Sequence, residues 1–389
     1  MKPLTPLLLA LAASALQLQL PPQWRTHANA LRSKIDAYRA QLPSVASLPR
    51  LLEMEVPQFL KDLADPIAAS PVLALHRSLV QIPSITGNER PVADWLVAYL
   101  VAHNLTVETQ AVAGDRVNVL AYPGAARATH TLLTSHLDTV PPHYPYRASP
   151  GGGTLAGRGS VDAKASVAAQ VTAALELLAE GAVREGDLAL LFVVGEEHDG
   201  AGMRAANALG LAWKAVIFGE PTDNRLAVGH KGLLQFAVLA TGTAAHSGYP
   251  HLGVSAISRL VRALAALDAL SLPGSPLLGP STLNIGRIAG GVAPNVVAAA
   301  ANASVAVRVA GDLAAIEAAV RGAVAAVPGV SFAPASVAYA AVELDHDVPG
   351  FDTVVCAYGT DVPYLAGAHK KYLYGPGSSV SPRSLASVL

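Results

Sequence analysis

The sequence predicts an α/β protein, with a mostly parallel sheet, helices on both of its faces and an inserted ferredoxin-like α+β domain. Two patterns indicate this fold. Apolar strand segments alternate with helical segments over residues 71–229, as is typical of parallel sheets. Over residues 230–340 the predicted elements follow the order βαββαβ, which is the ferredoxin-like arrangement. Residues 341–389 are then expected to return to the first domain as an incomplete part of it.

The first domain takes its elements from clearly bounded runs. The segments VNVLAYPG, HTLLTSHLDTV, DLALLFVVG and WKAVIFGEPT are expected to be strands. DLALLFVVG is apolar without interruption, which indicates a strand buried on both faces. AKASVAAQVTAALELLAEG predicts a helix, with Asp162 near its start and Gly181 near its end, and AGMRAANALG predicts a short one.

In the inserted domain, too, strand patterns and helical patterns of apolar residues can be told apart. Its expected strands are LLQFAVLATG, STLNIGRIAG, AAAANASVAVRVA and VSFAPASVAYA, and its expected helices are VSAISRLVRALAAL and DLAAIEAAVRGAVAAV.

The N-terminus, MKPLTPLLLALAASALQLQ, has the features of a secretory signal peptide over residues 1–15. Lys2 precedes a short apolar run, and Ala13-Ser14-Ala15 fits a cleavage site. A buried N-terminal helix is the alternative. Residues 16–70 carry helical patterning broken by prolines. Two N-x-S/T triplets, at Asn104 and Asn302, are compatible with a secreted glycoprotein.

Composition excludes several classes of partner. The formal net charge is -1, from 27 basic and 28 acidic residues, so we expect no face that binds nucleic acid. Beyond the N-terminus no apolar run approaches the ~20 residues of a membrane span, so we expect no membrane insertion. Cys356 is the only cysteine, which rules out a disulfide within the chain.

Acidic residues and one histidine follow the ends of three predicted strands. His136 and Asp138 follow TLLTS, Glu196 and Glu197 follow LLFVVG, and Glu220 follows AVIFG. Because ligand sites in open α/β sheets lie at the carboxyl ends of the strands, these groups converge if the strands are neighbours.

Such a cluster of carboxylates, with Asp162 added, needs positive charge nearby. A mixed histidine and carboxylate set fits Zn²⁺, with Mn²⁺ or Co²⁺ as alternatives. The adjacent Glu196 and Glu197 can then divide their tasks, because one can bind metal while the other takes a proton from water.

Two other classes of site are alternatives, and both are disfavoured. GAGMRA, residues 200–205, matches the dinucleotide pattern G-x-G-x-x-A, and Glu220 follows it at the distance of a ribose-binding acid. The acidic residues just before it would repel a pyrophosphate, so this interpretation is disfavoured. No G-x-S-x-G occurs, which disfavours a serine hydrolase.

Seven segments in order resemble one family: SHLDTVP, GRGSVDAKASVAA, VVGEE, FGEPT, AHSGYP, GGVAPN and YGPGS. They are similar to the dizinc peptidases and deacylases, which include acetylornithine deacetylase, succinyl-diaminopimelate desuccinylase, aminoacylase and glutamate carboxypeptidase. The secreted fungal carboxypeptidase-like members are the most similar branch. The resemblance covers about residues 70–378.

The resemblance implies a two-zinc centre in the catalytic domain, residues 71–229, with a cis peptide between Asp162 and Ala163. It implies roles for six residues: first-metal ligands His136 and Glu220, bridging ligand Asp162, second-metal ligand Glu197, general base Glu196, and Asp138, which orients the imidazole of His136.

For the inserted lid and dimerisation domain the resemblance implies substrate contacts. His246 would polarise the substrate carbonyl, from a dimer partner in some members, so a homodimer through this domain is expected. Asn295 and Arg308 would hold the substrate carboxylate. Gly375 and Gly377 would lie in a loop whose backbone approaches that carboxylate. The alternatives are a surface histidine, a solvated arginine and a plain turn.

The sequence departs from the family after YGPGS. The family supplies a last histidine to the second metal there, whereas this chain reads SSVSPRSLASVL. His346 and His369 are candidate substitutes, although neither matches the motif. We therefore expect an incomplete second zinc site, through a wrongly placed gene end, a truncated isoform or a real loss.

The expected function is metal-dependent hydrolysis of an amide bond next to a free carboxylate, as in a secreted carboxypeptidase. The substrate would be a peptide, or an N-acyl-amino acid if the protein is a deacylase. The alternative of another class is a secreted relative without catalytic activity.

Overall fold

The computed structural model describes residues 67, 70–149, 154–333 and 337–378. The chain divides into two units, residues 1–65 and 66–389. The first unit lies outside the described residues, and with it the predicted signal peptide and almost all of the predicted helical segment 16–70.

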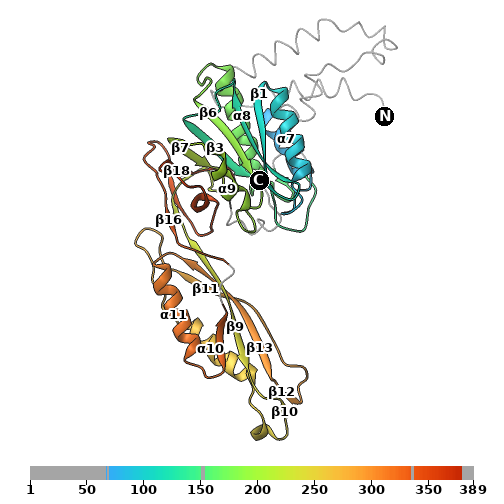
Figure 1. Ribbon diagram of the computed structural model, residues 1–389, viewed down its shortest axis with the longest axis vertical. Coiled ribbons are helices and arrows are strands. Elements are labelled where there is room, and N and C mark those ends of the chain that lie inside the picture. Colours follow the sequence, from blue (N-terminus) through green and yellow to red (C-terminus); the bar gives the residue numbers. More distant parts are fainter. Residues whose placement is uncertain (1–66, 68–69, 150–153, 334–336, 379–389) are drawn as a thin grey trace, which may run out of the picture. The chain divides into compact units, whose positions relative to one another are not determined.

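A six-stranded mixed sheet forms the first domain (Figure 1). Its order is β1–β2–β6–β3–β7–β18, where the strands are β1 Leu105–Ala113, β2 Arg116–Pro123, β6 Leu188–Val193, β3 Thr131–His136, β7 Ala215–Phe218 and β18 Lys370–Leu373. β6, β3, β7 and β18 run parallel, and β2 pairs antiparallel with both β1 and β6. The mostly parallel sheet is confirmed, and β1 is an additional strand outside the predicted segments.

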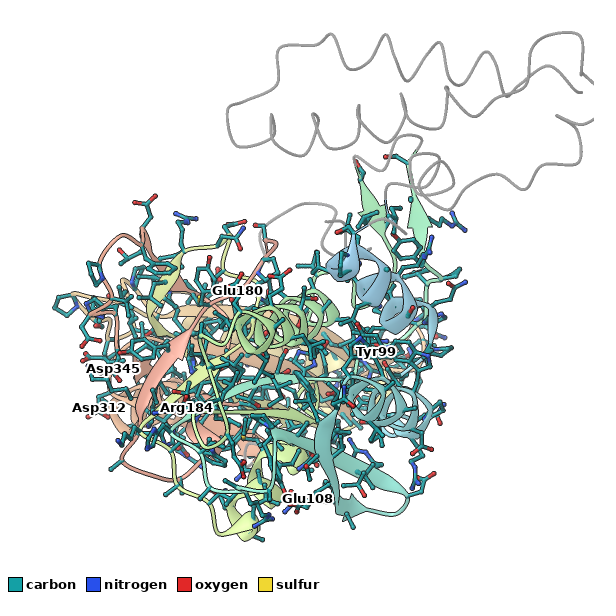
Figure 2. The ribbon with its side chains drawn as sticks, turned by 90° about the horizontal axis from the view of Figure 1, so that it is seen from above. Tyr99, Glu108, Glu180, Arg184, Asp312 and Asp345 are labelled. Atoms are coloured by element: carbon teal, nitrogen blue, oxygen red, sulfur yellow. The ribbon has the colours of Figure 1, made fainter. Side chains whose placement is uncertain are left out.

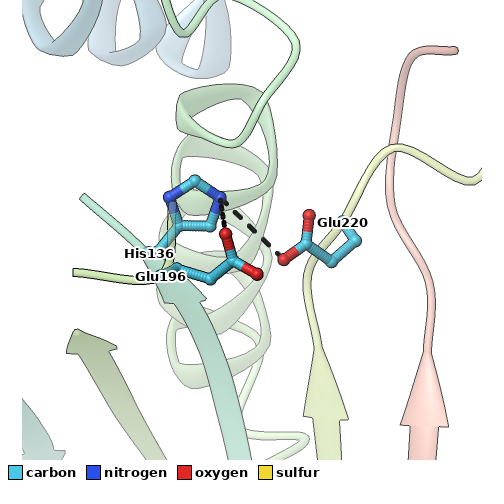
Figure 3. A group of neighbouring side chains, drawn as sticks. All are labelled: His136, Glu196 and Glu220. Atoms are coloured by element: carbon cyan, nitrogen blue, oxygen red, sulfur yellow. Dashed lines mark ion pairs between the residues drawn. The ribbon is translucent and has the colours of Figure 1, made fainter. Parts of the chain in front are cut away.

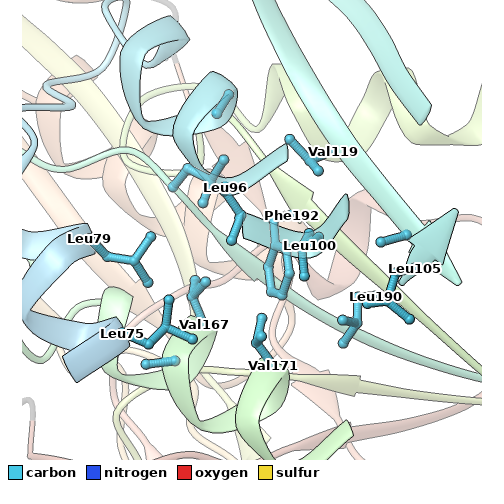
Figure 4. Close-up of a cluster of buried hydrophobic side chains, with 14 of the residues drawn as sticks. Leu75, Leu79, Leu96, Leu100, Leu105, Val119, Val167, Val171, Leu190 and Phe192 are labelled. Carbon is cyan, nitrogen blue, oxygen red and sulfur yellow. The ribbon is translucent and has the colours of Figure 1, made fainter. Parts of the chain in front are cut away.

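Each face of this sheet is covered. Helices α6 Pro71–Gln81, α7 Arg90–Ala102 and α8 Lys164–Ala179 pack on one face, where Leu79, Leu96 and Phe192 are fully buried (Figure 4). The short helix α9 Ala201–Ala206 contributes Met203 and Ala206 to the core of the other face. All six residues of β6 are buried, as expected for a strand between two apolar layers.

The inserted domain has the ferredoxin-like topology that the sequence predicts. Its sheet order is β11–β13–β9–β14 with every pair antiparallel, formed by β9 Gly232–Thr241, β11 Thr282–Gly290, β13 Ala300–Val309 and β14 Val330–Ala333. Helices α10 Ala256–Asp268 and α11 Leu313–Ala325 cover one face. Asp312, which is labelled in Figure 2, precedes α11. It caps this helix, because its carboxylate accepts from the N–H of Ala315 at 3.0 Å.

On the other face of the inserted sheet no helix of the described residues packs, and burial alternates along β9 and β13 accordingly. Beyond the lid, β18 rejoins the main sheet beside β7. The remaining elements are short: β4 Arg147–Ala148, β5 Leu155–Ala156, β8 Leu226–His230, β10 Ala245–His246, β12 Val296–Val297, β15 Ala338–Tyr339, β16 Val342–Glu343, β17 Thr353–Cys356, and the 3-10 turns η3 Asn207–Leu209, η4 Pro250–Leu252 and η5 Val362–Tyr364. Within the described ranges no helix is long and apolar enough to cross a membrane.

Candidate metal centre

The ends of three parallel strands bring the predicted site residues together. His136 is the last residue of β3 and pairs with Val193, the last residue of β6. Glu196 and Glu197 follow in the turn after β6, and Glu220 follows β7 on the other side of β3. The sheet order therefore places the imidazole between the two sources of carboxylates.

His136 is the centre of the cluster. Its Nε2 lies 4.0 Å from Glu196 Oε2 and 3.9 Å from Glu220 Oε1 (Figure 3). The same nitrogen lies 3.0 Å from Asp162 Oδ1. Its Nδ1 lies 3.0 Å from the carbonyl oxygen of Asp138, which can only accept, so Nδ1 donates there. Nε2 is the nitrogen left to face the carboxylates, which is the orientation that a metal ligand needs.

Asp138 holds the turn that carries the glutamate pair. Its carboxylate accepts from the backbone N–H of Glu196 at 3.0 Å and of Glu197 at 3.2 Å, and from the hydroxyl of Thr86 at 2.8 Å. Burial alone would raise the pKa of Asp138, but hydrogen bonds with His136, Thr86 and Glu197 N–H hold it below its ordinary value. Asp138 is thus ionised, and it fixes both the turn of Glu196 and Glu197 and the loop of Thr86.

The three glutamates of the cluster are destabilised in their charged form. Burial and then the charge of Glu220 raise the pKa of Glu196 well above its ordinary value, and burial likewise raises that of Glu220. Burial and then Asp162 raise the pKa of Glu197 to about 8. Three acids with raised pKa values around one imidazole form a site that a cation would stabilise.

The donor atoms fit a divalent metal. His136, Glu196 and Glu220 form one group whose ligand atoms all lie within 4.8 Å of one another, and His136, Asp162 and Glu197 form another. Imidazole nitrogen and carboxylate oxygen are donors that zinc accepts in proteins. Both groups depend on the same Nε2, which can bind one ion only. No other histidine of the described segments joins either group.

The structure does not support the two substitutes for the last histidine. Lys370 is the first residue of β18, and Thr131 is the first residue of β3. Both pair with Ala215 of β7, so they lie at the same level of the sheet. His369, one residue before Lys370, therefore lies at the opposite end of the sheet from His136, about 20 Å away along the strand direction at the usual rise per residue. His346 follows Asp345, which is hydrogen-bonded to the backbone of Lys371 at that same end. Neither can complete the zinc site.

A pocket of about 620 Å³ opens beside these carboxylates. Arg308 of the lid lies in its wall, so this predicted substrate-binding residue is placed with the metal groups. The lining residues come from both domains: Asp162, Glu196, Glu197, His198, Asp199, Glu220, Pro221, Leu233, Gln235, Arg308, Val337, Tyr339, Tyr358, Gly359, Thr360 and Tyr364.

Gly375 and Gly377 lie against the same site. A Cβ on Gly375 would come within 2.5 Å of the Glu220 carbonyl oxygen and of Ser166 Oγ. Gly377 has a φ of +84°, and a Cβ there would lie 2.7 Å from Val161, next to Asp162. Glycine is required at both positions for the loop to approach the metal groups. The peptide between Asp162 and Ala163 is cis, as the resemblance implies.

His246 and Asn295 are not brought to the pocket. Leu233, at the start of β9, lines the pocket, whereas Thr241 ends that strand eight residues later, about 26 Å away. His246 lies beyond that end, where it pairs with Val296 and Ser247 N–H donates to the carbonyl of Asn295. Within one chain these two residues cannot contact a substrate held by Arg308.

Asp361 is a site residue that sequence reasoning missed. It is 4% exposed, and neither carboxylate oxygen has a hydrogen-bond partner. Burial raises its pKa to about 7, with Asp138 also raising it and His136 opposing. Asp361 follows the apolar strand β17 after a short turn, so the strand-end pattern that revealed Glu196 could have revealed it.

Residues 228–329 match the model of the M20 peptidase dimerisation domain. A peptidase M20 domain-containing protein of Schizosaccharomyces pombe is 49% identical over 337 residues, which cover 84% of this chain and 82% of that relative. The chain belongs to the M20 peptidase family. A "probable carboxypeptidase" of Aspergillus clavatus is 49% identical over 354 residues, covering 82% of this M20 protein and 78% of the relative.

Solved M20 structures share the fold. A tripeptidase of Staphylococcus aureus has a TM-score of 0.66 at 21% identity, covering 78% of this chain and 89% of that one. An M20 family metallo-carboxypeptidase of Sulfolobus solfataricus has a TM-score of 0.61 at 16% identity, covering 79% and 92%. The predicted family and α/β fold are confirmed, and this M20 protein is a hydrolase.

Proposed function

We propose that this M20 protein is a zinc-dependent carboxypeptidase, which hydrolyses the amide bond next to a free carboxylate. One observation carries the proposal: Arg308 lines the same pocket as Asp162, Glu196, Glu197 and Glu220. A guanidinium binds a carboxylate in a fixed orientation, which would present the adjacent amide to the metal groups. The "probable carboxypeptidase" relatives support this choice.

The side chains divide the work as follows. His136 and Glu220 would hold zinc with Asp162, and bound zinc would act as a Lewis acid on the amide carbonyl and on water. Glu196 would take the proton of the attacking water and return it to the leaving amine. Asp138 would fix the turn of Glu196 through its two backbone hydrogen bonds.

The assignment of Glu196 as base and not as ligand rests on the family resemblance. Its carboxylate lies close enough to His136 and Glu220 to share an ion with them, so distance alone admits both roles. Its side chain is 14% exposed and lines the pocket, which gives it access to substrate.

The test is release of the carboxyl-terminal residue from N-acyl dipeptides by the purified full chain in zinc. We expect release of one free amino acid per amide cleaved, and none in the presence of a chelator. N-acyl-amino acids serve as the comparison, because a deacylase would hydrolyse these faster than N-acyl dipeptides. Cleavage of neither substrate by zinc-loaded protein would contradict both assignments and favour a non-catalytic relative.

We also propose that the protein works as a homodimer, in which His246 acts on the partner's pocket. The dimerisation-domain match and the placement of His246 at the far end of the lid support this. Mixing a Glu196→Ala chain with a His246→Ala chain would then restore about a quarter of wild-type activity, because one site in each mixed dimer has both groups. Unrestored activity, with dimers shown by light scattering, would place His246 outside the reaction.

A further inference from the structure

We propose that the pocket selects substrates whose carboxyl-terminal residue has an uncharged, apolar side chain, and that Leu233 and Tyr339 set this preference. The inference rests on the proposed function, because it takes Arg308 as the group that binds the substrate carboxylate.

Strand register places these residues in one row. Tyr339 of β15 is paired with Leu233 of β9, and Leu233 is paired with Arg308 of β13. Directly paired residues of antiparallel strands point to the same face, with Cβ atoms about 5 Å apart. All three residues line the pocket. A carboxylate held by Arg308 therefore leaves the side chain of the same substrate residue beside Leu233.

An apolar wall continues from this row. The ring of Tyr339 lies edge-on to the ring of Tyr364, with 6.1 Å between centroids. Its hydroxyl fills the space that a side chain at Gly359 would occupy, so the tyrosine spans from the lid to the catalytic domain. Val337, two residues before Tyr339, lines the same pocket. Leu233, Val337 and the two rings offer apolar surface to a substrate side chain.

The sheet next to Arg308 offers no partner for a charge. Its two direct neighbours are Leu233 on β9 and Thr282 on β11, and the next row toward the centre pairs Gln235 with Ala306. None of these four can ionise. The carboxylates of the pocket come instead from the catalytic domain. Asp162, Glu196, Glu197 and Glu220 lie around His136, and Asp199 follows the glutamate pair in the same turn. A charged substrate side chain beside Leu233 would lose hydration without gaining an ion pair.

The test compares kcat/KM for N-acyl dipeptides that share the acyl residue and end in Leu, Phe, Ser, Asp or Lys. We expect the Leu and Phe substrates to exceed the Asp and Lys substrates by about tenfold or more. Leu233→Lys should lower the value for Leu by about tenfold and raise that for Asp, since the new ammonium supplies a partner. Tyr339→Ala should reduce the Leu-to-Ser ratio, whereas Tyr339→Phe should keep it.

Leu239→Lys is the matched control. Leu239 lies on the same strand and face as Leu233, is 42% exposed and is absent from the pocket wall, so its substitution should leave the profile unchanged. A wild-type profile that favours charged residues, or one that Leu233→Lys does not change, would overturn the proposal.

Measurements of substrate binding test this specificity independently of the proposed carboxypeptidase activity. Equilibrium affinities of the same dipeptides for the Glu196→Gln chain report selectivity without turnover. Selective binding of the Leu and Phe peptides by a protein that hydrolyses none would support the specificity and refute the carboxypeptidase assignment. Hydrolysis of all these dipeptides at equal rates, with equal affinities, would support the carboxypeptidase assignment and refute the specificity.

Discussion

Replacing Glu196 by alanine is expected to lower kcat by about 10²–10⁴-fold while leaving the zinc content nearly unchanged. The side chain that the variant loses would carry the proton from water to the leaving amine. His136, Asp162 and Glu220 remain in place to hold the ion. Zinc analysis and kcat measured on the same preparation check both halves of this expectation.

Two variants serve as controls for Glu196→Ala. Glu220→Ala should lose zinc, because Glu220 would hold the ion together with His136 and Asp162. Glu176→Ala, on the exposed side of α8, should retain both activity and metal. If Glu196→Ala loses its zinc, Glu196 is a ligand, as its distance of 4.0 Å from His136 Nε2 allows, and the base must be sought elsewhere.

Zinc is expected to raise the melting temperature by about 5 °C or more at saturating concentration, and by more at pH 8 than at pH 6. Zinc must displace protons from the ligands before it binds. Burial raises the pKa of Glu197 to about 8, and raises those of Glu196 and Glu220 as well. Metal binding therefore competes with protons over this whole pH range.

The sign follows from proton linkage. In the metal-free protein the raised carboxyl pKa values make the folded state bind more protons than the unfolded state between about pH 4.5 and 8. This contribution to the free energy of unfolding falls as pH rises. Burial alone would lower the pKa of His136, but hydrogen bonds with Asp138 and Asp162 outweigh it, so the pKa lies well above its ordinary value. The contribution of His136 to the free energy of unfolding is therefore also lost as pH rises through its pKa in the folded state. Zinc replaces these protons, so its effect grows with pH.

Other buried groups make the free energy of unfolding rise with pH, but their contributions cancel when stability in zinc is compared with stability in chelator. Burial lowers the pKa of His230 to about 4 and that of Lys164 to about 7. Neither side chain belongs to a metal group, so we expect the same contribution in zinc and in chelator. The difference between zinc and chelator therefore isolates the metal groups. His136→Ala should abolish the zinc effect, whereas His369→Ala should keep it, because His369 lies at the other end of the sheet. A shift that is independent of pH, or that survives His136→Ala, would argue against this site.

Local patterns were sufficient for the strand ends that build the site. The uninterrupted apolar run before Glu196 predicted a buried strand, and parallel strands necessarily present their carboxyl ends at one edge. This logic places His136, Glu197 and Glu220 at one edge of the sheet, and the order β6–β3–β7 makes their strands neighbours, which brings the three residues together. The βαββαβ order likewise predicted the lid from local patterns, because the helical or strand periodicity of each segment was unambiguous.

What the sequence could not predict depends on register and pairing over long distances. His369 looked like a substitute ligand by its place in the chain, but pairing of β18 with β7 puts it at the wrong end of the sheet. His246 and Arg308 belong to one domain, yet the length of β9 separates them. The row of Tyr339, Leu233 and Arg308 exists only through cross-strand pairing, which no local pattern encodes.

Metal analysis of the purified full chain, after dialysis against zinc and then against buffer, tests the central claim most directly. The account predicts about one tightly bound zinc per chain or more, and loss of that zinc in His136→Ala. A wild-type chain that retains no zinc, and that still hydrolyses N-acyl dipeptides in excess chelator, would contradict it.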